Sequence, residues 1–330
     1  MLKLVILIIY FAVLIGIGLY CRKHATDVNG FVLGGRSVGP WLTAFAYGTS
    51  YFSAVVFVGY AGQFGWKYGI AATWAGIGNA IIGSLLAWVV LGRRTRIMSQ
   101  HLDSATMPQY FGKRFGSNPL KIGASVIIFI FLIPYTASLY NGLSRLFGMA
   151  FNIDYSVCII IMATLTAIYV IAGGYMATAI NDFIQGIIML FGIIAVIAAV
   201  IHSKGGFMSA LQGLANVSDP AVSDTPGIFA SFFGPDPFNL LCVVILTSLG
   251  TWGLPQMVQK FYAIDNEASI QKGTVISTIF ALIVSGGCYF LGGFGRLFSD
   301  QIDVKANGFD SIIPTMLSNL SPALIALVVI

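Results

Sequence analysis

Two polar stretches interrupt long apolar runs in this sequence, and their residue types suit the binding of a cation and a small solute. The first, AFAYGTSYFS, occupies residues 44–53 within the uncharged run 37–66. The second, TSLGTWGLPQ, occupies residues 247–256 and contains glycines and a proline, which weaken or break a helix. A break inside hydrocarbon leaves carbonyl and hydroxyl oxygens without helical partners, and such oxygens can bind a cation.

Ordinary helix packing is the alternative explanation for either stretch alone. Serine and threonine in membrane helices often bond back to a carbonyl one turn earlier, and small residues let helices approach closely. Two such stretches in matching positions of two halves favour a binding site over packing.

The composition indicates an integral membrane protein without a nucleic-acid partner. Hydrophobic residues make up 57% of the chain and charged residues 9%, against about 25% charged in ordinary soluble domains. The net charge of +5 comes from basic residues spread between apolar runs, not from one basic patch. Cys21, Cys158, Cys242 and Cys288 lack C-x-x-C spacing, so neither a transition-metal site nor a disulfide framework is expected.

Uncharged runs of membrane-spanning length predict an all-α, multi-pass protein of the plasma membrane, in contact with lipid. Eight such runs occur, at 4–21, 37–66, 68–92, 122–144, 155–181, 183–203, 238–259 and 273–295. Alternate loops hold most of the basic residues, and cytoplasmic loops retain lysine and arginine. This bias predicts an amino terminus on the outside.

The positions of the two polar stretches predict an inverted repeat. With residues 1–22 taken as a lead-in helix, the stretches fall in the first and sixth core helices, five apart, as in inverted-repeat transporters. We expect residues 37–203 to form a complete first repeat of five helices and residues 238–330 an incomplete second repeat. The apolar run after Pro322 is shorter than the roughly 20 residues of a membrane span, so we expect a longer parent protein.

Four motifs, in this order along the chain, resemble the sodium/solute symporter family, most closely its proline and pantothenate permeases. They are FVLGGRSVGPWLTAFAYGTSYFSAVVFVG, LDSATMPQYFGKRF, GGYMATAINDFIQG and TWGLPQMVQKFYAID. The resemblance implies a fold of the leucine-transporter type, with ten core helices in two inverted five-helix repeats, the second repeat being cut here within its third helix. It also implies Na⁺-driven symport of a small organic solute by alternating access, with no cofactor besides the coupling ion and no enzymatic activity.

The resemblance also implies a sodium site at the first break. Thr49 and Phe52 correspond to residues whose carbonyls hold Na⁺, and Ser53 is expected beside the ion. The family completes this site with hydroxyls of the eighth core helix, which would follow Ile330. Asp182 corresponds to an aspartate that helps Na⁺ leave toward the cytoplasm, although its spacing to Gln185 equally fits the N-cap of a helix over 183–203.

The solute itself is expected to be an amino acid such as proline or a carboxylate such as pantothenate. Tyr51 stands where proline permeases resemble one another in having an aspartate, which weighs against proline. The candidate solute-binding residues come from both breaks: Ser50, Tyr51, Thr251, Trp252, Pro255 and Gln256.

Two other function classes are open on the residues alone. The GRSVG match around Ser37 has the form of a serine hydrolase elbow, but His24, His101 and His202 lie scattered over loops. A channel is the stronger rival, because polar breaks also line pores. The oligomeric state is left open.

Overall fold

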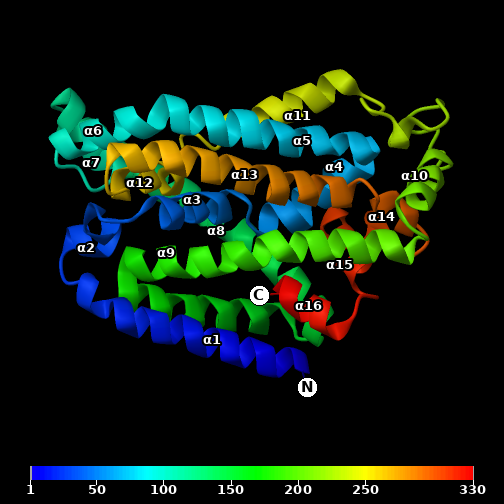
Figure 1. Ribbon diagram of the computed structural model, residues 1–330, viewed down its shortest axis with the longest axis horizontal. Helices are drawn as coiled ribbons and strands as arrows, with labels where there is room; N and C mark the ends of the chain where they lie inside the picture. The colour runs from blue at the N-terminus through cyan, green and yellow to red at the C-terminus, as the bar shows by residue number, and fades with distance from the viewer. Residues whose placement is uncertain (1, 330) are drawn as a thin grey trace.

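The computed structural model describes residues 2–329, and this range folds as a bundle of helices without a β-strand (Figure 1). Helices satisfy their own backbone hydrogen bonds, which is the requirement that hydrocarbon places on a spanning segment. The expectation of an all-α fold is confirmed for the described residues.

The described chain begins with α1 (Leu2–Cys21), and the short helix α2 (Val28–Leu33) follows it. The first core span is α3 (Pro40–Tyr51), which continues after a break as a π-helix (Val55–Tyr60) and then as α4 (Ala61–Tyr68). The predicted interruption of this span is therefore confirmed.

The chain then reverses at Gly69 and returns along the bundle. Gly69 has φ +63°, and a Cβ there would lie 2.0 Å from the Phe229 carbonyl oxygen, so only glycine fits. The returning span consists of α5 (Thr73–Gly78), two π-helical segments (Asn79–Leu86 and Trp88–Gly92) and α6 (Arg93–His101). The next helices are α7 (Met107–Phe115) and α8 (Asn118–Phe151).

The element α9 (Tyr155–Ser203) contains two antiparallel legs that meet at Gly174 (Figure 1). Gly174 has φ +58°, and a Cβ there would lie 2.8 Å from the Phe31 carbonyl oxygen. The predicted boundary at Asp182, between runs 155–181 and 183–203, is wrong, because a positive-φ glycine and not the charged residue makes the turn. Asp182 lies inside the second leg and is not an N-cap.

After α9 the chain contains another interrupted span, and a continuous helix follows it. The short helix α10 (Phe207–Ala215) precedes α11 (Pro237–Leu249). After a break come α12 (Pro255–Ala263) and α13 (Glu267–Gly292). The chain continues through α14 (Val304–Asn307) and α15 (Ile312–Leu317) into α16 (Pro322–Val329).

Helix length and composition agree with a multi-pass membrane protein. Within residues 2–329, four helical stretches are long and apolar enough to cross a bilayer: Val55–His101, Asn118–Phe151, Tyr155–Ser203 and Glu267–Gly292. The turns at Gly69 and Gly174 divide two of these stretches into antiparallel segments. On α8, Phe129 and Phe131 are 71% and 69% exposed, as expected of side chains that face lipid.

Glycines bring α13 into backbone contact with the first two core spans. A Cβ at Gly65 of α4 would lie 2.0 Å from the Gly292 carbonyl carbon, and one at Gly76 of α5 would lie 2.6 Å from the Gly286 Cα atom. Small residues at such crossings let membrane helices gain van der Waals contact along their backbones. We refer to these four glycines as the glycine seam.

The seam predicts that Gly292→Ala will destabilise the fold. A Cβ at residue 292 would lie 1.9 Å from the Ala61 carbonyl oxygen, so the helices must separate, at a loss of about 2–3 kcal/mol. Gly286→Ala on the same helix is the control, because its Cβ would meet nothing within 4 Å. Thermal unfolding in detergent measures both, and an equal Tm for the two variants would contradict the seam.

Candidate functional site

The first core span is interrupted at Phe52 and Ser53. The Phe52 amide still donates to the Gly48 carbonyl (2.9 Å), but its φ and ψ of −100° and 61° are not helical. The next helical bonds start from the Ser53 carbonyl, which accepts from the Val56 and Phe57 amides at 3.0 and 3.1 Å. The last carbonyls of α3 therefore lie at a helix end, where carbonyls have no partner along the helix.

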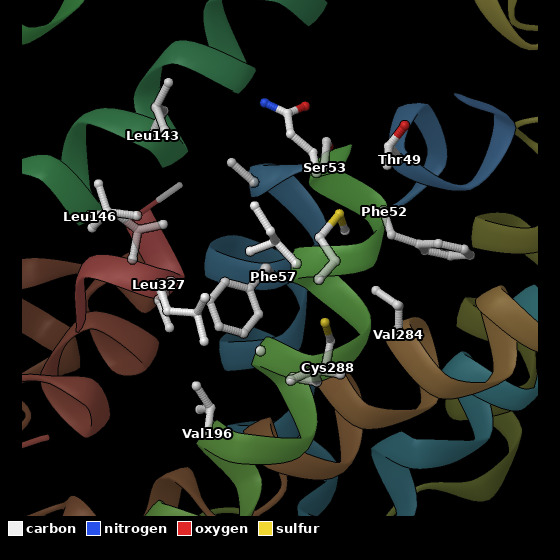
Figure 2. Close-up of a pocket in the computed structure, with 18 of the residues that line it drawn as sticks. Thr49, Phe52, Ser53, Phe57, Leu143, Leu146, Val196, Val284, Cys288 and Leu327 are labelled. Carbon is white, nitrogen blue, oxygen red and sulfur yellow. The ribbon is translucent and has the colours of Figure 1, made fainter. Parts of the chain in front are cut away.

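A cavity of about 280 Å³ lies beside this break. Its walls come from the break itself and from α8, α9, α13 and α16 (Figure 2). Thr49 and Ser53 lie at one end, and Val196 and Cys288 lie at the other. The polar lining residues are Thr49, Ser50, Ser53, Asp182 and Gln185, and the rest of the lining is largely apolar. The cavity thus has a polar part, which is lined by oxygen-bearing side chains, and a larger apolar part.

The oxygens at the polar end suit a hard monovalent cation. The Thr49 hydroxyl lies within hydrogen-bonding distance of the Phe45 carbonyl (3.0 Å) and beside the Asp182 carboxylate, so it can donate to either. Carbonyl, hydroxyl and carboxylate oxygens of an unwound membrane helix are the ligands that transporters use for Na⁺.

Asp182 is paired with a buried lysine that the sequence reasoning did not place here. Lys260 of α12 lies with Nζ 3.6 Å from Asp182 Oδ2, and the two side chains are 7% and 21% exposed. The ammonium also lies 5.0 Å from the centre of the Tyr175 ring. Lysine at the end of an apolar run is typical of a loop at the membrane surface. Nothing in the neighbouring sequence therefore predicts that this side chain points into the bundle.

The second break is formed as predicted, but its side chains do not line this cavity. The chain turns over residues 250–254, between α11 and α12. The Thr251 hydroxyl donates to the Ser248 carbonyl (3.0 Å), and the Trp252 indole donates to the Ile82 carbonyl (3.0 Å). Pro255 begins α12, and the Gln256 amide lies beside the Tyr135 hydroxyl of α8.

Tyr51 connects the two breaks instead of lining the cavity. Its side chain is 6% exposed, and its hydroxyl donates to the Thr247 carbonyl at 2.9 Å. The structure thus brings five of the predicted residues to one cavity, namely Thr49, Ser50, Phe52, Ser53 and Asp182. It leaves five outside the cavity lining, namely Tyr51, Thr251, Trp252, Pro255 and Gln256.

Asn79 holds the second break in place and was missed from sequence. Its amide donates to the Ser285 hydroxyl (3.3 Å), and its oxygen accepts from the Thr247 and Ser248 hydroxyls (3.0 and 3.1 Å). Asn79 is 1% exposed. A lone asparagine within the uncharged run 68–92 is the signal that was available, because such residues bond between membrane helices.

Arg36 closes the end of the bundle at which α2, α6, α7 and α12 gather, which we call the basic end (Figure 1). Its guanidinium donates to the carbonyls of Ser99, Ser104 and Tyr262 at 3.3, 2.9 and 3.3 Å. Burial lowers the pKa of Arg36, and Asp103 opposes this shift. Ser37 donates to the Gly34 carbonyl at 2.8 Å, so its hydroxyl serves a local turn.

Comparison with known proteins identifies relatives over nearly the whole chain. A sequence profile described as the sodium:solute symporter family matches residues 31–330. The osmoregulated proline transporter OpuE of Bacillus subtilis is 29% identical over 299 residues, covering 90% of this chain and 59% of that protein. A sodium/proline symporter of Staphylococcus aureus is 29% identical over 315 residues, covering 91% of this chain and 57% of that protein. The chain therefore spans less than two thirds of the length of these relatives.

A solved structure shares the fold. It is the substrate-bound outward-open state of a Na⁺-coupled sialic acid symporter, reported with a novel Na⁺ site. The similarity has a TM-score of 0.75 at 15% sequence identity and covers 100% of this chain and 69% of that chain.

The hydrogen bonds of Asn79 predict a measurable loss of stability in Asn79→Ala. Three interhelical bonds at about 0.6 kcal/mol each give a loss of about 2 kcal/mol. Ser84→Ala is the matched control in the same π-helical segment, because Ser84 makes one such bond, to Ser277 at 2.8 Å. The fall in Tm should be clearly larger for Asn79→Ala, and equal falls would contradict its role in joining three spans.

Proposed function

The chain belongs to the sodium:solute symporter family, and we propose that it couples Na⁺ entry to the uptake of a small organic solute across the plasma membrane. The observation that carries the proposal is the cavity beside the break at Phe52 and Ser53, which is lined by three hydroxyl-bearing residues of that break region and by Asp182. A hard cation replaces its hydration shell with oxygen ligands. Among the described residues that line the cavity, Asp182 is the only charged one.

In this proposal Na⁺ binds at the carbonyls of Thr49 and Phe52 and at the hydroxyl of Ser53. Asp182 lies at the same polar end and gives the ion a route toward the basic end of the bundle. A carboxylate attracts a cation more strongly than a neutral group does, so Asp182 favours the ion's passage over its return to the outside.

The proposed solute is a small amino acid or carboxylate. The two relatives named above are proline transporters, which makes proline the first candidate for this chain. Ser50 lines the cavity, whereas Tyr51 is engaged by Thr247 and contributes its ring to the wall between the breaks. Gln256 lies outside the cavity lining, and its amide lies beside the Tyr135 hydroxyl, so these two groups are candidates for a solute contact nearer the second break.

We further propose that the basic end faces the cytoplasm and that the amino terminus lies outside. The helices α6 and α7 carry most of their charge as arginine and lysine, which cytoplasmic segments retain. In this arrangement, residues 37–203 and 238–330 are the two inverted repeats, each beginning with an interrupted span.

The packing at the basic end favours a carrier mechanism over a channel. Buried side chains from α2, α9 and α12, including Leu33, Tyr175 and Tyr262, pack into one apolar cluster there. Arg36 ties the same end together through three carbonyls. An end of the bundle that is closed by packed side chains suits alternating access more than continuous permeation.

Uptake measurements test this function. Cells that produce the full-length protein should accumulate radiolabelled proline, or pantothenate if proline fails, in a saturable manner when Na⁺ is present and not when choline replaces it. Uptake that rises linearly with solute concentration would indicate a channel. Saturable uptake that is indifferent to Na⁺ would contradict sodium coupling.

The role of the Thr49 carbonyl predicts different effects of two substitutions. Thr49→Ala keeps the carbonyl in place and should raise the half-saturating Na⁺ concentration by no more than about threefold, because the hydroxyl bonds back to Phe45. Thr49→Pro removes an amide and clashes with the carbonyl one turn earlier, so sodium dependence should be lost. Thr49→Ser is the control, and loss of the sodium response in Thr49→Ala would identify the hydroxyl as the ligand instead.

A further inference from the structure

Lys260 is a basic residue buried inside the helical bundle, where its ammonium group forms an ion pair with one carboxylate, that of Asp182. Its ammonium lies 3.6 Å from Asp182 Oδ2, and its side chain is 7% exposed. The Tyr175 ring, at 5.0 Å, supplies a second favourable contact on the same helix as Asp182. A buried ammonium is strongly unfavourable without a charged partner, so the position of Lys260 depends on the Asp182 carboxylate.

Asp182 meets two environments at once. It borders the cavity together with Thr49 and Ser53, and it also pairs with Lys260, which is not part of the cavity lining. A second cation that approaches the carboxylate from the cavity is repelled by the ammonium, because charges interact strongly over a few ångströms away from bulk water. Na⁺ in the cavity and the Lys260 ammonium therefore compete for one carboxylate.

The ion pair also joins two helices at the basic end. Lys260 belongs to α12, which follows the second break and packs on α3 and α6. Val258 and Tyr262 of α12 lie in one apolar cluster with Tyr175 and Ala179 of α9. Release of Lys260 removes the charged contact between these helices and leaves the apolar one.

We propose that Lys260 is a tethered counter-ion of Asp182, which Na⁺ must displace on its way toward the basic end. While the carboxylate lacks Na⁺, the ammonium neutralises it and holds α12 against α9. When Na⁺ takes the carboxylate, the ammonium is released and the contact between the two helices loosens. The inference rests on the proposed function, in which Asp182 lies on the path of Na⁺, and it makes Lys260 a positioning residue that sets sodium affinity.

Sodium binding to the purified protein tests the competition. Radioactive Na⁺ is titrated in detergent, with choline keeping the ionic strength constant. Lys260→Gln removes the competing charge, so the dissociation constant for Na⁺ should fall by at least about threefold. Lys260→Arg keeps the charge and should stay within about twofold of the wild-type value. Lys272→Gln, the same change at an exposed lysine, should have no effect.

A purely structural ion pair makes the opposite prediction. Loss of the ammonium would then leave sodium affinity unchanged or weaker in Lys260→Gln, and that result overturns the inference. In the double variant Lys260→Gln with Asp182→Asn, the gain in affinity should disappear, because its cause is the freed carboxylate. A gain that persists in the double variant overturns the inference as well.

Chemical labelling of the wild-type protein provides a test that no variant's folding can affect. A small amine-reactive anhydride is applied with Na⁺ or with choline, and mass spectrometry compares acylation at Lys260 with that at the exposed Lys272. Na⁺ should raise labelling of Lys260 relative to Lys272, because the displaced ammonium becomes accessible. Equal or lower labelling in Na⁺ overturns the inference.

The two hypotheses fail in distinguishable ways. A wild-type protein that binds no Na⁺ and takes up no solute in response to it overturns the proposed function together with this inference. A wild-type protein that binds Na⁺ while Lys260 responds neither in affinity nor in labelling overturns the inference alone.

Discussion

Hydrocarbon offers no partner to a peptide group, and the interrupted spans exist only because protein surrounds them. The break at Phe52 is enclosed by α8, α9 and α13, and Tyr51 donates from it to the carbonyl of Thr247 near the second break. Asn79 then joins that region to Ser285 of α13. The interrupted backbone segments are thus positioned by residues from several other spans. The candidate site therefore depends on the packing of the whole bundle.

Sequence was sufficient for the local features of the fold. The breaks at residues 52–53 and 250–254 are encoded by small, hydroxyl-bearing and helix-breaking residues, and hydropathy alone places the chain in a membrane. The turn at Gly174 was misplaced because charge was taken as the mark of a loop. The backbone there needs a positive φ and a close approach to Phe31, and neither requirement is visible in a hydropathy pattern.

The composition of the site was less accessible, because its contacts join residues far apart in sequence. Asn79 and Ser285 are 206 positions apart, and Gln185 donates to Tyr10 across 175 positions. Lys260 has the sequence context of a membrane boundary, yet it lies beside Asp182 because α12 is short and packs inward on α3. The five residues that share the cavity were identified through a family motif, and the hydrogen-bond partners that orient them were not.

The glycine seam has a consequence for motion. Backbones that touch at Gly65 and Gly76 cannot slide past α13 without first separating, so we expect these spans and α13 to move together. The seam glycines do not line the cavity, whose α8 and α9 wall contains long flexible side chains such as Leu146 and Met189. Such side chains can change rotamer if α8 and α9 shift relative to α3 and α13. Access to the cavity therefore depends on how freely the side chains of α8 and α9 that line it can rearrange against the more rigid side of the bundle.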